Sequence, residues 1–411
     1  MAILESKLTF GGMMVTLAAL ALGASLVLLA ACAPAAAPTP SPIPATAAPP
    51  AAKATTAPAA PPVAKATAAP AATTAAAPPK TTSSALAQVI EGAKKEAKVS
   101  IMIQSDLAGE KVKEIREGIK KNYGLDLEIG AVPSASYPAA LAQAISEFKA
   151  GATPSLDFMP ASDLSTVQGM QAGVIEKVDW EPLLAPGTPK EVIKEGGYGI
   201  NTFQSHLGLV YDPRVIPAAE APKSFADLGN PKWRNKIAMY NYANNYLTYA
   251  YVLGPEKFVP QLRAIMSNNP AAEIYANGQR RYMSGEYPIL LTSSQIYLQI
   301  KKAGVPVEFV SPDISWLQNH NMILIKGSKV PNAARLVAAF LAGPDGHKIH
   351  NSVSRGSMLY PGNVEFDLHE IDQKAGLRVF QQDKSPESVQ FFLSDKGKQV
   401  EKEIGDILQG K

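Results

Sequence analysis

Hydrophobic positions alternate between helix-like and strand-like spacing from residue 84 onward. Apolar side chains first recur every three or four residues, which predicts a helix over 85–96 with Ser84 as its N-cap. The same reasoning predicts strands at 99–103, 125–129 and 156–159 and helices over 112–119, 138–150 and 162–172. Such alternation is typical of an α/β fold with a parallel sheet, where ligands bind beyond the carboxyl ends of the strands.

A second alternation follows a turn-rich segment at 196–217, which contains a strand at 207–211. It predicts strands at 237–239, 288–291 and 305–310 and helices near 244–252, 256–267, 274–284 and 294–303. A strand at 322–325 and a helix at 333–341 should return to the first part. Because about 330 residues are too many for one comfortable core, we expect two lobes, the first made of 84–205 and 311–411 and the second of 206–310.

The N-terminal segment carries an export signal. Glu5 and Lys7 are its only charged residues before an uncharged run over 8–31, which ends in Leu29-Ala30-Ala31-Cys32. That ending resembles the bacterial lipobox, so we interpret 1–31 as a lipoprotein signal peptide and Cys32 as the lipidated residue. An uncleaved anchor helix is the alternative, and both place the chain at a membrane, on the outer face of the cell envelope or in the periplasm. Cys32 is also the only cysteine, so no disulfide is possible within the chain.

Residues 32–83 are dominated by Ala, Pro, Thr and Ser, with Lys53, Lys65 and Lys80 as the only charges. This composition cannot bury enough apolar surface to fold, so we expect a disordered tether or, with the same composition, a glycosylated stalk. With these lysines, Lys7 and Glu5 set aside, 35 basic and 35 acidic residues remain. An electrically balanced folded part argues against a nucleic-acid surface.

Several short motifs occur in a fixed order through the folded part. They are IEGAKKEAKV at 90–99, LGLVYDP at 207–213, PKSFADL at 222–228, PKWR at 231–234, SGEYPI at 284–289, GVPV at 304–307 and KGS at 326–328. Over roughly 84–362 the chain resembles the iron(III)-type branch of the family-1 extracellular solute-binding proteins of ABC importers. The resemblance implies a two-lobed periplasmic-binding-protein fold (type II), with a ligand cleft between lobes joined by a hinge. It also implies a monomer that delivers a small solute to a membrane permease and needs no cofactor.

One departure from that family bears on the solute. In iron-binding relatives, two adjacent tyrosines follow the strand that corresponds to 288–291, whereas Gln295 and Ile296 stand there in this chain and Tyr297 comes one step later. Ferric iron prefers several anionic oxygen ligands. We therefore expect an organic or oxyanion solute, with ferric iron as the alternative within the same family.

Polar residues at the ends of predicted strands are the candidate ligand contacts. In the second lobe, three hydroxyls and an amide at a helix start favour an anion, although one of them would suffice as an N-cap. A loop rich in tyrosine and asparagine precedes another helix of the second lobe. In the first lobe, serines and an aspartate follow the strands, and helix capping is the simpler role for them. A tryptophan near the return crossing could stack on a solute or pack under a loop. The candidates are Thr292, Ser293, Ser294, Gln295, Tyr240, Asn241, Asn244, Ser105, Asp106, Ser134, Ser162 and Trp316.

Metal and enzyme signatures are absent from the sequence. The five histidines show no metal-ligand spacing, and no nucleophile elbow, phosphate loop, dinucleotide fingerprint or zinc-protease helix is present. The chain is therefore predicted not to be an enzyme, with a lipid-anchored hydrolase as a remote alternative. A solute-sensing module for a membrane receptor is the other alternative to import. In the tail, Val400, Ile404 and Ile407 predict a helix, which we expect to pack on the first lobe.

Overall fold

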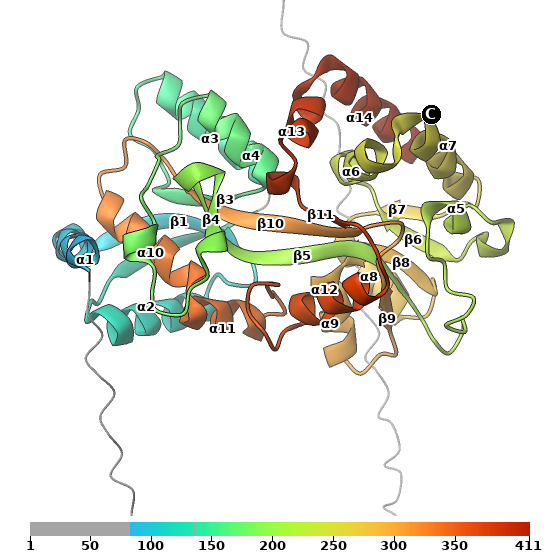
Figure 1. Cartoon of the computed structure of the whole chain (residues 1–411), viewed down its shortest axis with the longest axis horizontal. Coiled ribbons are helices and arrows are strands. Elements are labelled where there is room, and N and C mark those ends of the chain that lie inside the picture. Colours follow the sequence, from blue (N-terminus) through green and yellow to red (C-terminus); the bar gives the residue numbers. More distant parts are fainter. Residues whose placement is uncertain (1–82, 135) are drawn as a thin grey trace, which may run out of the picture. The chain divides into compact units, whose positions relative to one another are not determined.

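A computed structural model describes residues 83–134 and 136–411 (Figure 1). The predicted signal peptide, the lipidation at Cys32 and the tether, apart from Ser83, lie outside the described residues. Within the described residues, no helix combines the length and apolar character needed to cross a membrane.

The first lobe is built on three strands, with β1 (Lys98–Gln104) parallel to both β2 (Glu128–Ser134) and β3 (Phe158–Ala161). Its helices are α1 (Ser84–Glu96), α2 (Glu110–Tyr123), α3 (Tyr137–Lys149) and α4 (Asp163–Gln171). Helix α1 begins one residue earlier than predicted, because the Ser83 hydroxyl accepts a hydrogen bond from the backbone N–H of Leu86.

Strand β2 begins three residues later than predicted and continues to Ser134. Its register against β1 pairs Lys98 with Glu128 and Gln104 with Ser134. The sheet partner, rather than the apolar run at 125–129, therefore decides where the strand lies. As a result, the ends of β1 and β2 meet at the same edge.

The second lobe is also built on parallel strands, with β6 (Ile237–Tyr240) between β7 (Ala271–Glu273) and β8 (Ile289–Ser293). Its helices are α5 (Phe225–Leu228), α6 (Ala243–Leu253), α7 (Pro255–Met266), α8 (Tyr275–Met283) and α9 (Ser294–Lys302). The bounds of β6, β8, α6, α7, α8 and α9 agree with the predicted elements to within two residues, whereas α5 and β7 were not predicted.

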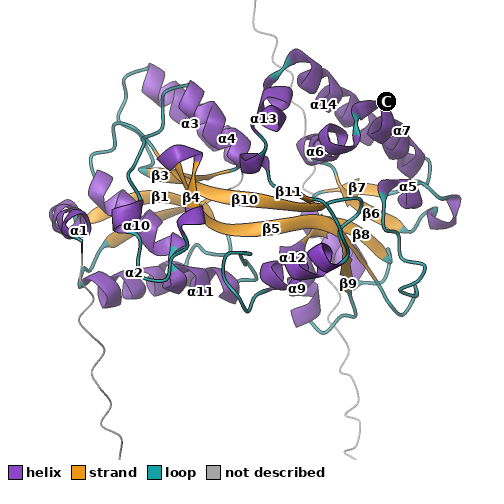
Figure 2. Cartoon of the chain, viewed as in Figure 1, coloured by secondary structure: helices purple, strands orange, loops and turns teal. Residues whose placement is uncertain are grey.

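Two long strands join the lobes, β5 (Gly199–Tyr211) and β10 (Ser315–Leu324) (Figure 2). They pair antiparallel from Trp316 with Leu207 to Met322 with Ile200. Strand β10 also pairs with β3, and β5 continues along β8. Both strands are longer than predicted because their buried polar residues interrupt the apolar pattern. The short strands β4 (Ile193–Lys194), β9 (Glu308–Val310) and β11 (Val379–Phe380) lie beside them.

The hydrophobic core has two large clusters, one in each lobe. The first gathers side chains of β1, α1, α2 and α10 (Pro331–Ala342), which returns to the first lobe as predicted. The second gathers side chains of β6, α6 and α7 around the far end of β5.

The C-terminal segment contains α11 (Pro344–Ser352), α12 (Val364–Lys374), α13 (Pro386–Leu393) and α14 (Asp395–Leu408). Helices α13 and α14 pack on α6, and α14 also packs on α7. The prediction that the tail packs on the first lobe is therefore wrong. The spacing of Val400, Ile404 and Ile407 correctly indicates an apolar stripe, but periodicity does not reveal which complementary surface covers it; here it is the core of the second lobe.

The tail should contribute measurably to the stability of the second lobe. Ile404 is fully buried against α6 and α7, whereas Ile371 on α12 is 59% exposed. We predict that Ile404→Ala lowers the free energy of unfolding by about 2–4 kcal/mol, because it leaves a cavity. The matched Ile371→Ala should change it by less than about 0.5 kcal/mol. Urea unfolding of both variants measures the difference, and equal effects would show that α14 is not part of the core.

Candidate ligand-binding cleft

A pocket of about 450 Å³ contains residues from both lobes. The first lobe contributes the end of β1, the end of β2 and the start of α3, and the second contributes the start of α8. Arg355, from the segment after α11, completes the lining. The lining residues are Gln104, Ser105, Asp106, Ser134, Ser136, Tyr137, Tyr275 and Arg355.

The strand register explains why the first-lobe residues meet. Gln104 and Ser134 are paired neighbours at the ends of β1 and β2. The Ser105 hydroxyl donates to the Ser134 carbonyl at 3.4 Å, and the Ser136 hydroxyl caps α3 by accepting from the Ala139 N–H. The predicted candidates Ser105, Asp106 and Ser134 therefore lie together in one pocket.

Asp106 connects the two lobes. Its carboxylate accepts a 2.8 Å hydrogen bond from the side-chain amide of Gln295, which lies in the first turn of α9. It also accepts from the Nε of Arg355, at 3.1 Å to each oxygen. A carboxylate, an amide and a guanidinium from three separate segments thus form one polar cluster at the cleft.

A hydrogen-bond chain fixes the side chain of Gln104. The Tyr137 hydroxyl lies 3.1 Å from Nδ1 of His320 and accepts from Nε2 of Gln104 at 2.9 Å. Loss of hydration around the imidazole, together with the positive charge of Arg355, lowers the pKa of His320 to about 3. Because the Gln104 amide donates to the tyrosine oxygen, the tyrosine proton is directed to Nδ1 of the neutral imidazole, which then carries its own proton on Nε2. The Gln104 carbonyl oxygen Oε1 is left as a buried acceptor that has no partner among the described residues.

Aromatic and imidazole rings form the wall behind Arg355. The guanidinium lies 4.6 Å from the centre of the Phe203 ring, which stacks on His320 at 4.1 Å. His350 lies 5.2 Å from the same ring. Burial and the charge of Arg355 hold the pKa of His350 well below its ordinary value. Both histidines are therefore neutral, and Arg355 carries the positive charge of this wall.

The second lobe presents Tyr275 to the pocket. Its hydroxyl accepts from the side-chain amide of Asn245 at 2.8 Å, and its ring lies 5.3 Å from those of Tyr240 and Tyr242. Tyr240 itself is buried behind Tyr275, while Asn241 and Asn244 are exposed and do not line the pocket.

Several other predicted candidates also lie away from the pocket. Thr292 is buried in β8, and Ser293 is the residue before α9 without a capping side-chain bond. Ser162 caps α4. Trp316 is buried in β10, edge-on to Tyr249 at 5.4 Å, so of its two predicted roles the structure shows packing.

Five pocket residues are not among the sequence-based candidates, namely Gln104, Ser136, Tyr137, Tyr275 and Arg355. Tyr137 and Tyr275 each occupy the first position of a helix. The tyrosine- and asparagine-rich loop that lies against Tyr275 could have pointed to this side of the cleft. Arg355 had no local signal, since 249 residues separate it from Asp106.

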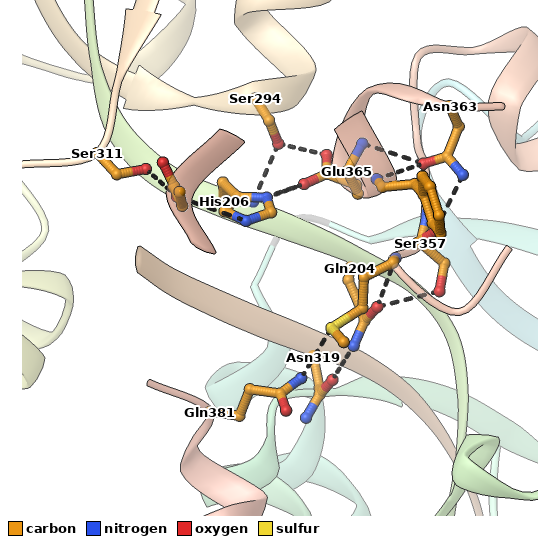
Figure 3. A network of polar contacts seen from close by, with 12 residues as sticks. Gln204, His206, Ser294, Ser311, Asn319, Ser357, Asn363, Glu365 and Gln381 are labelled. Carbon is orange, nitrogen blue, oxygen red and sulfur yellow. Dashed lines mark hydrogen bonds and ion pairs between the residues drawn. The ribbon is translucent and has the colours of Figure 1, made fainter. Parts of the chain in front are cut away.

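Ser294 belongs to a buried polar network along β5 and β10 (Figure 3). Its hydroxyl donates to Glu365, which also accepts from the backbone N–H of His206 at 2.8 Å and lies 2.7 Å from Nδ1 of His206. Asn363 accepts from the Glu365 N–H and from the Ser357 N–H, each at 3.0 Å. Ser294 therefore holds the base of α9 to α12 and β5, while its neighbour Gln295 is bonded to Asp106, which lines the pocket.

The network continues onto β10. The side-chain amide of Gln204 donates to Asn319 at 2.9 Å, and its carbonyl accepts from the Ser357 hydroxyl at 3.0 Å. Asn319 donates to Asp163 at the start of α4. Burial and the nearby charge of Asp383 raise the pKa of Asp163 to about 7. Gln204 of β5 and Asn319 of β10 thus find their partners inside the protein.

No group of three or more His, Cys, Asp or Glu side chains in the described part of the chain is placed to hold a metal ion.

Comparison with known proteins gives the family to which the sequence is similar. A family model described as bacterial extracellular solute-binding protein matches residues 114–356, more than half of the chain. No protein of curated function matches in sequence.

Solved structures match the fold. The substrate binding protein of an ABC transporter from Agrobacterium tumefaciens has a TM-score of 0.62 at 13% identity, covering 76% of this chain and 94% of that one. Iron-bound HitA from Pseudomonas aeruginosa has a TM-score of 0.58 at 16% identity, covering 76% and 99%. A putative spermidine/putrescine ABC transporter protein from Listeria monocytogenes has a TM-score of 0.56 at 16% identity, covering 76% and 99%. The predicted α/β periplasmic-binding-protein fold is confirmed.

Removal of the buried carboxylate of the network should destabilise the folded protein. Glu365 is fully buried and takes hydrogen bonds from Ser294 and from two groups of His206. We predict that Glu365→Ala lowers the free energy of unfolding by about 3–5 kcal/mol, because these donors lose their acceptor. Glu370→Ala, which removes an exposed glutamate of the same helix, should cost less than about 1 kcal/mol. Guanidinium unfolding compares the two, and a small effect of Glu365→Ala would contradict the structural role of the network.

The neutral His350 should make stability depend on pH. The folded-state pKa of His350 lies well below the ordinary value near 6.5. As pH falls, the imidazole is therefore protonated in the unfolded chain but not in the folded protein, and this stabilises the unfolded state. The contribution of His350 is complete above about pH 6.5 and falls by about 2 kcal/mol at pH 5. We predict that the stability of His350→Leu decreases less between pH 7.5 and pH 5 than that of the unchanged protein. Parallel curves from urea unfolding at several pH values would refute this.

Proposed function

This chain belongs to the bacterial extracellular solute-binding proteins, and on that premise we propose that it captures a small organic solute in the cleft and delivers it to the permease of an ABC importer. The family binds solutes rather than transforming them, so the chain is not an enzyme. Solved structures of the same fold include proteins described as ABC transporter components, which supports the importer role.

The pocket between the lobes carries this proposal. Its volume of about 450 Å³ falls within the range of small-molecule sites and exceeds the need of a bare ion. Its lining combines tyrosine rings with hydroxyls, an amide and one carboxylate–guanidinium pair. Such a mixture suits a polar organic molecule that contacts both lobes.

The tyrosine nearest to the expected iron-binding positions supports an organic solute over ferric iron. Tyr297 is buried in a cluster of the second lobe, where its ring lies 5.7 Å from that of Phe309. Its hydroxyl accepts from Lys301 at 3.2 Å, and it does not line the pocket.

The remaining features follow from the sequence. We propose a monomer, attached to the membrane through a lipid on Cys32 and a flexible tether, with the lobes divided near residues 206 and 310. The tether would let the folded part reach the permease from its anchor.

A ligand screen tests the proposal. The purified protein, unfolded and refolded to remove bound solute, is heated in a calorimeter with ferric citrate, thiamine, polyamines, phosphonates or small carboxylates. A solute at one hundred times its Kd should stabilise the protein by about 2.7 kcal/mol and raise its Tm. We expect an organic solute to do so, and a response to ferric iron alone would contradict the proposal.

Tyr275 should contact the solute in the cleft through its aromatic ring. We predict that Tyr275→Ala weakens binding of the solute by about tenfold, because an aromatic contact contributes roughly 1 kcal/mol or more. Tyr287→Ala, in the same lobe but outside the pocket, is the control. Equal affinities of the two variants in isothermal titration calorimetry would place the solute elsewhere.

A further inference from the structure

The cleft also indicates the chemical class of the solute, an inference that rests on the function proposed above. We propose that the solute is an organic anion with a hydrogen-bond donor beside its acidic group, and that this acidic group replaces Asp106 on Arg355. Asp106 is then an internal competitor that sets the affinity and selectivity of the cleft.

Arg355 is the fixed partner of this exchange. Its side chain is 12% exposed, and its guanidinium lies on the Phe203 ring, with the neutral His320 and His350 behind. Among the described residues that line the pocket, it is the only Lys or Arg. A guanidinium held by a ring on one face can present its N–H groups to a carboxylate or phosphonate in the pocket.

Asp106 is the exchangeable partner. It lies in the turn after β1, and its side chain is 28% exposed. Within the described structure its carboxylate is held by side chains alone, those of Arg355 and Gln295. Rotation of one side chain would therefore free both donors, one of them at the start of α9, without breaking a backbone hydrogen bond.

Charge repulsion and shared N–H donors make Asp106 and an anionic group of the solute compete for Arg355. Two like charges 4 Å apart repel by about 4 kcal/mol at the effective dielectric constant near a protein surface. The Nε–H of Arg355 already donates to both oxygens of Asp106, so an anion that takes this group competes with Asp106 and is repelled by it. An anionic solute must therefore displace Asp106, and the free energy needed to move Asp106 lowers its affinity.

Gln104 indicates the second feature of the solute, a hydrogen-bond donor beside its acidic group. It is 4% exposed, and its carbonyl oxygen Oε1 is a buried acceptor without a partner among the described residues. The chain through Tyr137 and His320 prevents the amide from turning this oxygen away. Gln104 lines the pocket, and we expect a hydroxyl, ammonium or amide N–H near the acidic group of the solute to satisfy this acceptor when the cleft is occupied. Small hydroxycarboxylates, aminocarboxylates and aminophosphonates have this combination.

The decisive variant is Asp106→Asn, which keeps the shape of the side chain and removes its charge. Isothermal titration calorimetry is run with malate, citrate, amino acids and aminomethylphosphonate, with the neutral amide malamide, and with putrescine. We expect at least one of the acids to bind, and Asp106→Asn to tighten its binding about tenfold while leaving malamide unchanged. Asp126→Asn, which removes an exposed carboxylate paired with Arg116 and Lys120, should change neither.

Two further readouts separate the possible failures. Arg355→Gln should weaken binding of the acid at least tenfold, and the Tm of each variant shows whether it is folded. Weaker acid binding by Asp106→Asn, binding of putrescine alone, or binding of none of the acids would overturn the proposed class. In the first two cases the cleft still binds a solute and the proposed function stands, whereas a protein that no solute of the broader screen stabilises would fail the proposed function itself.

Discussion

The antiparallel pairing of β5 with β10 is the constraint on which the rest of the structure depends. These two strands belong to both lobes, since β10 continues beside β3 and β5 continues beside β8. Their polar side chains are buried where the lobes join, so each must find a partner inside the protein. The network through Gln204, Asn319 and Glu365 supplies those partners and ties α4, α9 and α12 to the joining strands.

The first two residues of α9 connect the junction between the lobes with the cleft. At the start of α9, Ser294 is bonded to the buried Glu365, and the next residue, Gln295, is bonded to Asp106 in the cleft. A change at Asp106 is thus one residue away from the network that fixes the relation between α9 and β5. Solute binding and lobe closure can be coupled through this contact, because a solute favours whichever arrangement it contacts best.

Most of the fold could be predicted from the sequence, but only part of the site could. Regular spacing of apolar residues located most of the helices, although α5 and α12 were not predicted, and the order of short motifs indicated the solute-binding family. Periodicity could not extend β5 to Gly199, where buried polar residues replace apolar ones, nor show that α14 covers α6 and α7. The predicted strand ends placed Ser105, Asp106 and Ser134 at one edge of the sheet, because parallel strands align their carboxyl ends. In the structure these three residues line the same pocket.

The other site residues depend on contacts that no local pattern reveals. Ser294 and Gln295 are neighbours at the start of α9, yet Ser294 is buried in the junction and Gln295 is bonded to Asp106 at the cleft. Arg355 comes from a distant turn, and only the fold places it beside Asp106. The most direct test is a crystal structure of the protein purified with the solute it carries from its source. The account predicts solute between Tyr275 and Arg355, with its acidic group on the guanidinium and Asp106 turned away. Solute bound outside this pocket, or a metal ion held by Tyr297, would contradict it.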